Sequence, residues 1–207
     1  MLHTKGYCVH KNVVGKLQPP KGGNQVIDSF IFNNKRKGGD KRRLQAPIID
    51  QDNAFCQTLF NFLRRNYPNH IPNAMVKLFS LPKCQQQVAH ADYEPTLEFA
   101  TSSDDMVPLE CLVAFEPGTK LVVWPESIRL ACMSDELRTE YVEEHGPITA
   151  HEICLEPGDI LIFRGDLIHA GAAYKYQNTR VHLYLDSPDV PREGNRTWFP
   201  SDDWIVQ

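Results

Sequence analysis

The sequence predicts a mainly β protein whose short strands wrap into a jelly roll, with α-helices on its flanks. Short apolar and β-branched runs recur along the 207 residues and are separated by Gly, Pro and Asn, a pattern typical of β-sandwiches and barrels. A strand–Glu-Pro-Gly–strand unit occurs twice, around 116–118 and 156–158. Because Pro followed by Gly suits the two central positions of a type II turn, each unit predicts two neighbouring strands, as in a jelly roll.

Two helices interrupt the predicted strands. The first is expected over 50–67, where apolar residues form one stripe and Asp50 or Asp52 can cap the start. The second is expected over 134–145, with Ser134 as its cap. This second helix either packs at the edge of the barrel or covers a cavity as a lid. Strands are expected at 6–14, 75–80, 88–93, 107–115, 120–124, 153–155, 159–163, 167–170 and 180–186.

Length and composition indicate one globular domain over 1–207, long enough to bury a sizeable core. The chain has no run of about 18 apolar residues, so no membrane span is expected, and its start lacks the apolar segment of a secretory signal. Six cysteines without Cys-x-x-Cys spacing predict free thiols in a reducing compartment. These features favour a cytoplasmic location.

The charge of the chain is divided unevenly. Residues 1–46 carry a net charge of +8 and residues 47–207 carry −12, within a total of −4. A basic loop is expected at about 33–46, which can be a solvated loop, a nuclear-import signal or a contact for a polyanion such as nucleic acid. The side chains predicted for a polyanion contact are Lys35, Arg36, Lys37, Lys41, Arg42 and Arg43.

The predicted strand 180–186 alternates between two chemically different faces. One face carries Val181, Leu183 and Leu185, and the other carries Arg180, His182, Tyr184 and Asp186. A basic, aromatic and imidazole face indicates that this side of the strand lines a cavity. Arg180 can bind a carboxylate there in bidentate geometry, or it can simply pair with Asp186.

A candidate metal site combines two distant stretches. His90 and Asp92 are two residues apart, so on a strand both side chains point to one face. His169, on a later strand, adds a second imidazole. Two histidines and one carboxylate form the facial set that binds non-haem Fe(II) and leaves coordination positions open. His169 could instead be a core histidine, and His182 is interpreted as a cavity-lining residue and not as a ligand.

The pattern His90-x-Asp92, His169 and Arg180 resembles the 2-oxoglutarate- and Fe(II)-dependent dioxygenase superfamily. Within that superfamily the chain is most similar to the phytanoyl-CoA dioxygenase-like group, over roughly residues 75–186. The further residues that carry this similarity are Gly158-Asp159, Gly165, Gly171 and the opening Gly6-Tyr7-Cys8-Val9. The resemblance implies a double-stranded β-helix, a cupin-like core, with the first helix packed outside the sheet.

The resemblance also implies an activity. The implied activity is that of a hydroxylase, which couples decarboxylation of 2-oxoglutarate to succinate with hydroxylation of a substrate. The implied cofactors are Fe(II), 2-oxoglutarate and O2, with ascorbate as an optional reductant. His90, Asp92 and His169 would bind the iron and Arg180 the 2-oxoglutarate. Gln87 and Tyr184 are further candidates for the co-substrate, although Gln87 could be an ordinary loop residue, and no catalytic residue is expected beyond the metal ligands.

The substrate class stays open at the level of sequence. A small molecule, a lipid-like acid or a peptide side chain is expected. Nucleic acid is disfavoured as a substrate, because the AlkB-type pattern that residues 180–185 resemble requires a second Arg where Asp186 stands. Two other functions remain: a cupin-like metal-binding module or inactive relative without 2-oxoglutarate turnover, and a metal-dependent enzyme that uses no 2-oxoglutarate. The intact metal set and Arg180 argue against the cupin-like module, which a metal assay separates, and Arg180 discriminates against the enzyme without 2-oxoglutarate.

Overall fold

The computed structural model describes most of the chain. The described residues are 2–18, 27–28, 42–49, 51–188, 190, 197–201 and 203–206. Most of the predicted basic loop, including Lys35, Arg36, Lys37 and Lys41, lies outside them. Among the helices in the described ranges, none is both long enough and apolar enough to cross a membrane.

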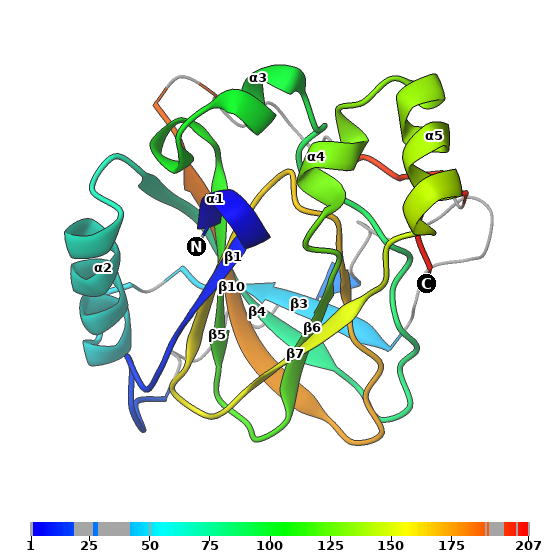
Figure 1. Ribbon diagram of the computed structural model, residues 1–207. Coiled ribbons are helices and arrows are strands. Elements are labelled where there is room, and N and C mark those ends of the chain that lie inside the picture. Colours follow the sequence, from blue (N-terminus) through cyan, green and yellow to red (C-terminus); the bar gives the residue numbers. More distant parts are fainter. Residues whose placement is uncertain are drawn as a thin grey trace.

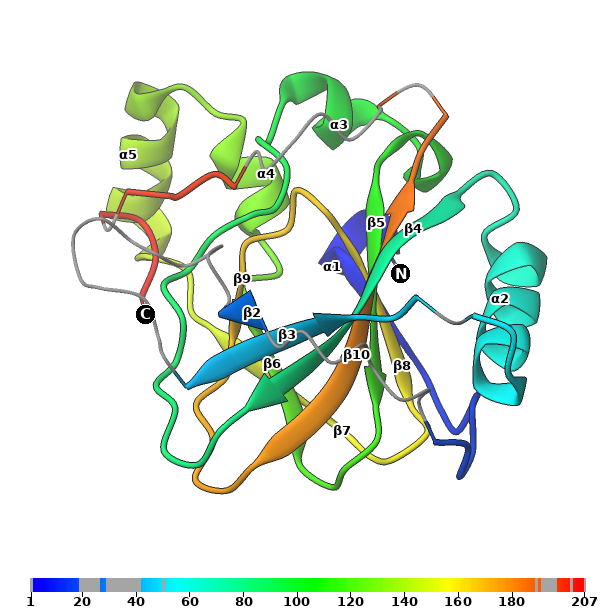
Figure 2. The same cartoon turned by 180° about the vertical axis from the view of Figure 1, so that it is seen from behind.

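Two antiparallel sheets face each other and enclose the centre of the molecule (Figure 1; Figure 2). The larger sheet contains, in spatial order, β1 (Tyr7–His10), β8 (Ile160–Arg164), β5 (Leu109–Ala114), β10 (Asn178–Asp186), β4 (Ile71–Ser80), β3 (Arg43–Pro47) and β2 (Ile27–Asp28). The smaller contains β7 (His151–Leu155), β6 (Thr119–Val123) and β9 (His169–Gly171). The prediction of a mainly β jelly roll with flanking helices is confirmed.

Strand β10 lies in the middle of the larger sheet, between β5 and β4, and its two faces differ as predicted. Val181, Leu183 and Leu185 are fully buried in a core shared with the outer helix α2 (Ala54–Asn66). That helix contributes Phe55, Cys56, Leu59 and Leu63. Burial of one such apolar side chain stabilises the fold by roughly 1.5–3 kcal/mol. A shift of β10 by one residue would expose these side chains, so this layer fixes the register of β10 and directs its polar face toward the space between the two sheets.

The start of α2 differs from the prediction. The cap is Asn53, whose side chain accepts a hydrogen bond from the backbone N–H of Cys56 at 3.0 Å. Asp52 instead accepts a hydrogen bond from the side chain of Gln57, and Asp50 lies outside the described residues. The predicted caps were wrong because an N-cap side chain must reach the third helical N–H, and only the residue directly before Ala54 does so.

The stretch that carries His90 and Asp92 is not the regular strand predicted over 88–93. His90 forms an isolated bridge with His169, and the next residue, Ala91, forms one with Trp198. The backbone therefore bonds to β9 on one side and to the C-terminal segment on the other, through hydrogen bonds of 2.8–2.9 Å. A single ladder cannot form where successive residues have different partners, but the extended path is kept.

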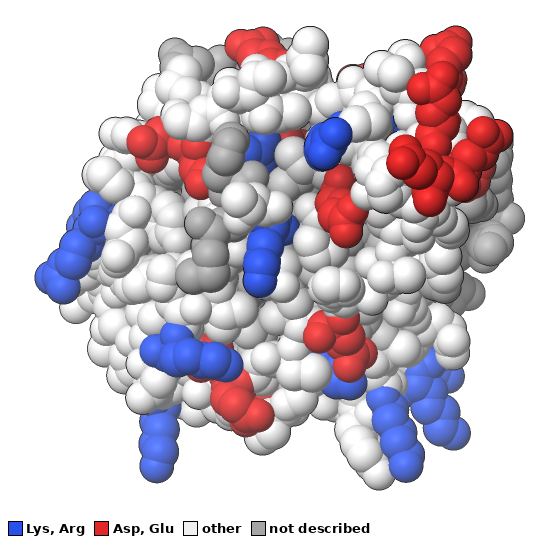
Figure 3. All heavy atoms as spheres, viewed as in Figure 1, with Lys and Arg blue, Asp and Glu red and all other residues white. Residues whose placement is uncertain are grey.

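Short helices cover one end of the two sheets, as Figure 1 shows. They are α1 (Leu2–Lys5), α3 (Leu97–Thr101), the 3-10 turn Asp104–Met106, α4 (Ser127–Ala131) and α5 (Asp135–His145). Ser134 caps α5 and Gly146, at φ +79°, ends it, as predicted. The exposed acidic residues of α5 form the red area at the upper right of Figure 3. All six cysteines are free, as expected.

Candidate metal centre

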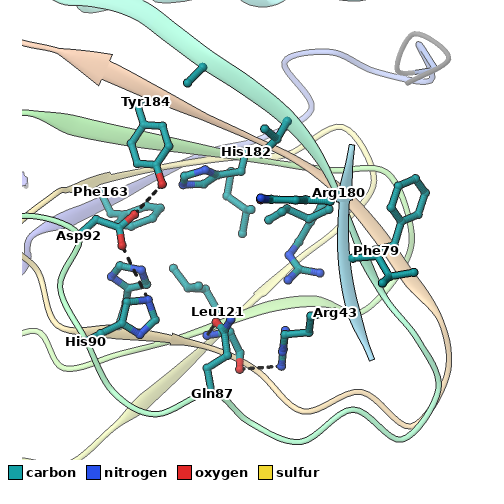
Figure 4. A pocket seen from close by; sticks show the side chains of 18 residues that line it. Arg43, Phe79, Gln87, His90, Asp92, Leu121, Phe163, Arg180, His182 and Tyr184 are labelled. Carbon is teal, nitrogen blue, oxygen red and sulfur yellow. Dashed lines mark hydrogen bonds and ion pairs between the residues drawn. The ribbon is translucent and has the colours of Figure 1, made fainter. Parts of the chain in front are cut away.

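A cavity of about 260 Å³ lies between the two sheets (Figure 4). Its wall is largely apolar and includes Leu44, Ala74, Val76, Leu78, Phe79, Leu112, Leu121 and Phe163. The polar residues that line it are Arg43, Gln45, Gln87, His90, Asp92, His169, Arg180, His182 and Tyr184. The structure therefore brings together all the site residues predicted between 87 and 184. No residue of α5 lines this cavity, so α5 packs at the edge of the barrel and does not cover the site.

His90, Asp92 and His169 meet at one end of the cavity. One ligand atom from each lies within 4.8 Å of the others. The bridge between His90 and His169 places their rings 4.4 Å apart, centroid to centroid. The Nε2 atom of His90 is 3.9 Å from Oδ1 of Asp92. These separations suit three donors around one cation.

Backbone carbonyls select the tautomer of both imidazoles. Nδ1 of His90 lies 2.7 Å from the carbonyl oxygen of Val88, and Nδ1 of His169 lies 3.0 Å from that of Leu167. Because a carbonyl oxygen only accepts, each Nδ1 carries the hydrogen and the neutral ring keeps its lone pair on Nε2. A metal-binding histidine is commonly oriented in this way by a hydrogen bond from its other nitrogen.

The protonation states of these groups also suit a cation. Burial, followed by the neighbouring His169, lowers the pKa of His90 to about 4, so its imidazole is neutral at pH 7. Burial alone raises the pKa of Asp92, but the rings of His169, His90 and His182 together with the Tyr184 hydroxyl bring it below its ordinary value. Two imidazoles and one carboxylate are the donor set that fits Fe(II) with open coordination positions.

Tyr184 belongs to this end of the cavity. Its hydroxyl donates a hydrogen bond of 2.9 Å to Oδ2 of Asp92. That contact holds one carboxylate oxygen, while Oδ1 is the oxygen near His90. The Tyr184 hydroxyl is thus placed to orient Asp92, and its contact with the co-substrate stays a prediction.

Arg180 faces the opposite part of the cavity and is only 5% exposed. Its Nη1 donates to the Ser80 hydroxyl at 2.9 Å, and its guanidinium lies over the ring of Tyr174. Asp186 is not its partner, since that carboxylate accepts from Asn73. Among the described residues no carboxylate pairs with Arg180. A buried cation of this kind is suited to an anionic ligand.

Gln87 is fixed between the two groups. Its backbone N–H donates to the carbonyl of Gly171 at 2.9 Å, and its side-chain oxygen accepts from the N–H of Gly171 at 2.7 Å. Gly171 is required for this approach, because a Cβ at 171 would lie 2.3 Å from that side-chain oxygen. Gln87 therefore forms part of the cavity wall, and its contact with the co-substrate stays a prediction.

Two features of the cavity were not predicted. Arg43 had been assigned to the exposed basic loop, but it is 4% exposed, belongs to β3 and lines the cavity. Its neighbour Arg42 is exposed and donates to the carbonyl of Pro82. His182 lines the cavity as expected, but its Nε2 lies 2.8 Å from the fully buried carboxylate of Glu110 on β5. Polar and apolar residues alternate over 43–47, which is a strand pattern and could have placed Arg43 on a strand face. The neighbouring basic residues made this pattern hard to recognise.

The fold is similar to that of solved structures that contain metal and 2-oxoglutarate. HygX from Streptomyces hygroscopicus, with nickel, 2-oxoglutarate and hygromycin B bound, has a TM-score of 0.59 at 12% identity, covering 90% of this chain and 84% of that one. SnoN, an epimerase in complex with Fe3+, alpha ketoglutarate and nogalamycin RO, has a TM-score of 0.55 at 12% identity, over 99% and 94%. EctD from S. alaskensis, with 2-oxoglutarate and 5-hydroxyectoine, has 0.53 at 13%, over 99% and 84%.

These likenesses define the class of fold. The predicted double-stranded β-helix, a cupin-like jelly roll, is confirmed by agreement over nearly the whole chain. No protein-family model matches the sequence, and no curated protein matches it.

Proposed function

We propose that this protein is an Fe(II)- and 2-oxoglutarate-dependent oxygenase that couples decarboxylation of 2-oxoglutarate to succinate with hydroxylation of a substrate. The observation that carries the proposal is the convergence of His90, Asp92 and His169 within 4.8 Å in a cavity that also holds the buried Arg180. Structures of the same fold that contain metal and 2-oxoglutarate support it. The narrower similarity to the phytanoyl-CoA dioxygenase-like group rests on the spacing from Gly158 to Gly171.

The chain supplies binding and orientation. Nε2 of His90 and of His169 and the carboxylate of Asp92 would hold the iron, and Tyr184 would keep that carboxylate in place. Iron and 2-oxoglutarate, when bound, supply the oxidative chemistry with O2. Arg180 would pair with the C5 carboxylate and so direct the keto-acid end of the co-substrate toward the metal ligands.

The cavity wall indicates how a substrate would be received. Many side chains of the cavity wall are aliphatic or aromatic, so an apolar portion of a substrate is favoured. This fits a small molecule, a lipid-like acid or a peptide side chain. Nucleic acid is disfavoured as the substrate. Ascorbate would act only as a reductant that keeps the iron in the Fe(II) state.

Metal binding tests the first half of the proposal. Anaerobic titration of the metal-free protein should show one Fe(II) per chain, and His169→Ala should lose this binding while the fold is retained. His145→Ala is the matched control, because His145 is an exposed histidine on α5. Stoichiometric iron binding by His90→Ala, Asp92→Ala and His169→Ala alike would refute the assignment.

Co-substrate binding tests the second half. Nickel-loaded protein should bind 2-oxoglutarate, and Arg180→Ala should weaken that binding about 30-fold or more, since losing a charge-assisted bidentate contact costs on the order of 2–5 kcal/mol. Metal affinity should be nearly unchanged, and the exposed Arg64→Ala serves as the control. Metal binding without affinity for 2-oxoglutarate would identify the alternative, a cupin-like metal-binding module. Succinate release above the uncoupled rate then identifies the substrate class.

A further inference from the structure

Arg43 is a second buried guanidinium in the cavity. It comes from β3, far in sequence from the candidate metal ligands, and is 4% exposed. In Figure 4, Arg43 and Arg180 lie on the same side of the cavity, across from His90 and Asp92. Two cationic side chains therefore face the candidate metal site across the cavity.

The head group of Arg43 is fixed by backbone carbonyls. Its Nη2 donates to the carbonyl oxygens of Gln85 at 2.6 Å, Gly171 at 3.0 Å and Ala172 at 2.7 Å. A Cβ at Gly171 would lie 2.8 Å from Nη1 of Arg43, so the absent side chain provides the space for this guanidinium. Arg43 is thus held in one orientation before any ligand arrives, which lowers the entropy lost on binding.

The two guanidiniums meet at one hydroxyl. The Ser80 oxygen accepts from Nη1 of Arg180 at 2.9 Å and from Nη1 of Arg43 at 3.3 Å, and Ser80 is fully buried. With both lone pairs of that oxygen engaged, its O–H remains available as a donor. Burial lowers the pKa of Arg180, and the nearby Arg43 lowers it further. Two like charges held together in a buried cavity favour an anion between them.

We propose that Arg43 binds the C5 carboxylate of 2-oxoglutarate together with Arg180 and Ser80. The inference rests on the function proposed above and extends it to a residue of the N-terminal strand. The shared contact at Ser80 is the reason for assigning Arg43 to the same carboxylate as Arg180. A carboxylate has two oxygens with about four acceptor positions, enough for two guanidiniums and a hydroxyl. Such a clamp selects a 2-oxo acid with a charged tail over one with an uncharged tail.

If Arg43 had a purely structural role, it would only donate hydrogen bonds to the three backbone carbonyls. Loss of these bonds would disturb the whole cavity and weaken the binding of every ligand that binds the metal through its keto acid. Loss of a carboxylate contact would weaken only ligands that carry the distal carboxylate. The two roles are therefore separated by comparing 2-oxoglutarate with 2-oxopentanoate, which has the same keto-acid end and an uncharged tail.

The test measures the affinities of both ligands for nickel-loaded wild type, Arg43→Gln and Arg43→Lys by calorimetry. Arg43→Gln also removes the bonds to the three carbonyls, so both ligands should weaken, but 2-oxoglutarate should weaken about 10-fold or more beyond 2-oxopentanoate. Equal weakening of both ligands, or no change in either, overturns the proposal. Arg42→Gln is the matched control, because this neighbouring arginine is exposed and does not line the cavity.

Two further outcomes are distinguished by the same measurements. If Arg43→Gln does not fold, Arg43→Lys provides the comparison: it loses the fork geometry, so the preference for 2-oxoglutarate should fall about threefold or more, and an unchanged preference overturns the inference. If nickel-loaded wild type does not bind 2-oxoglutarate at all, the proposed function itself is wrong. If wild type binds it tightly and Arg43→Gln binds it equally well, only the role of Arg43 is wrong.

Discussion

Gly171→Ala tests how closely β9 approaches the side chains of the cavity. A Cβ at this position would lie 2.3 Å from the side-chain oxygen of Gln87 and 2.8 Å from Nη1 of Arg43. Both distances are shorter than a non-bonded contact allows, so the Gln87 carboxamide must move. Its hydrogen bond from the backbone N–H of Gly171, now 2.7 Å, is then lost.

The free energies on the two sides can be compared. An unpaired buried N–H costs about 1–3 kcal/mol, and an extra methyl group in a packed site costs a similar amount. In the other direction, Ala restricts the unfolded chain more than Gly does and stabilises by roughly 0.4–1 kcal/mol, because Gly171 does not require a left-handed φ. The unfavourable terms are larger, so Gly171→Ala should destabilise the protein by roughly 1–5 kcal/mol.

The assay is urea denaturation of wild type, Gly171→Ala, Gln87→Ala and the double variant. Gln87→Ala removes the atom that the new methyl group would meet first. In that background Gly171→Ala should cost about 1 kcal/mol less than it does alone. Additivity of the two single changes within about 0.5 kcal/mol, or a Gly171→Ala variant as stable as wild type, would refute the steric reasoning.

Two further predictions concern stability. Asp159 is buried and accepts hydrogen bonds from Lys11 Nζ at 2.7 Å and from two backbone N–H groups. Burial raises the pKa of Asp159, but these bonds lower it below 3.8 overall, so its stabilisation is complete above pH ~4 and is lost as the pH falls through the lower folded-state pKa. Asp159→Asn should therefore cost about 1–3 kcal/mol in urea denaturation at pH 7 and progressively less as the pH falls below ~4. The exposed Asp105→Asn is the control, and a cost that does not fall with pH contradicts this. Asn53→Ala should cost about 0.5–2 kcal/mol in thermal unfolding and Asn53→Asp much less, and equal losses would show that the cap does not hold α2.

The sequence by itself was sufficient for features that are encoded within a few residues. The alternation of 180–186 predicted which side chains of β10 enter the core and which enter the cavity, because successive residues of a strand face opposite ways. The caps Ser134 and Gly146 predicted the ends of α5 for a similarly local reason. The residue types His90, Asp92 and His169 predicted a metal site, which stays a prediction, and the structure places the three side chains together in the cavity.

Only the tertiary structure decided the features that depend on distant partners. The segment 88–93 does not form a regular strand ladder, because His90 pairs with β9 and Ala91 pairs with Trp198. The local sequence pattern does not indicate these two partners. In the sequence, Arg43 is one of several basic residues in a run. In the structure, its guanidinium lies in the cavity, where it donates hydrogen bonds to the carbonyl oxygens of Gln85, Gly171 and Ala172. A buried guanidinium is tolerated only where acceptors surround it, and those acceptors come from segments up to 129 residues away along the chain.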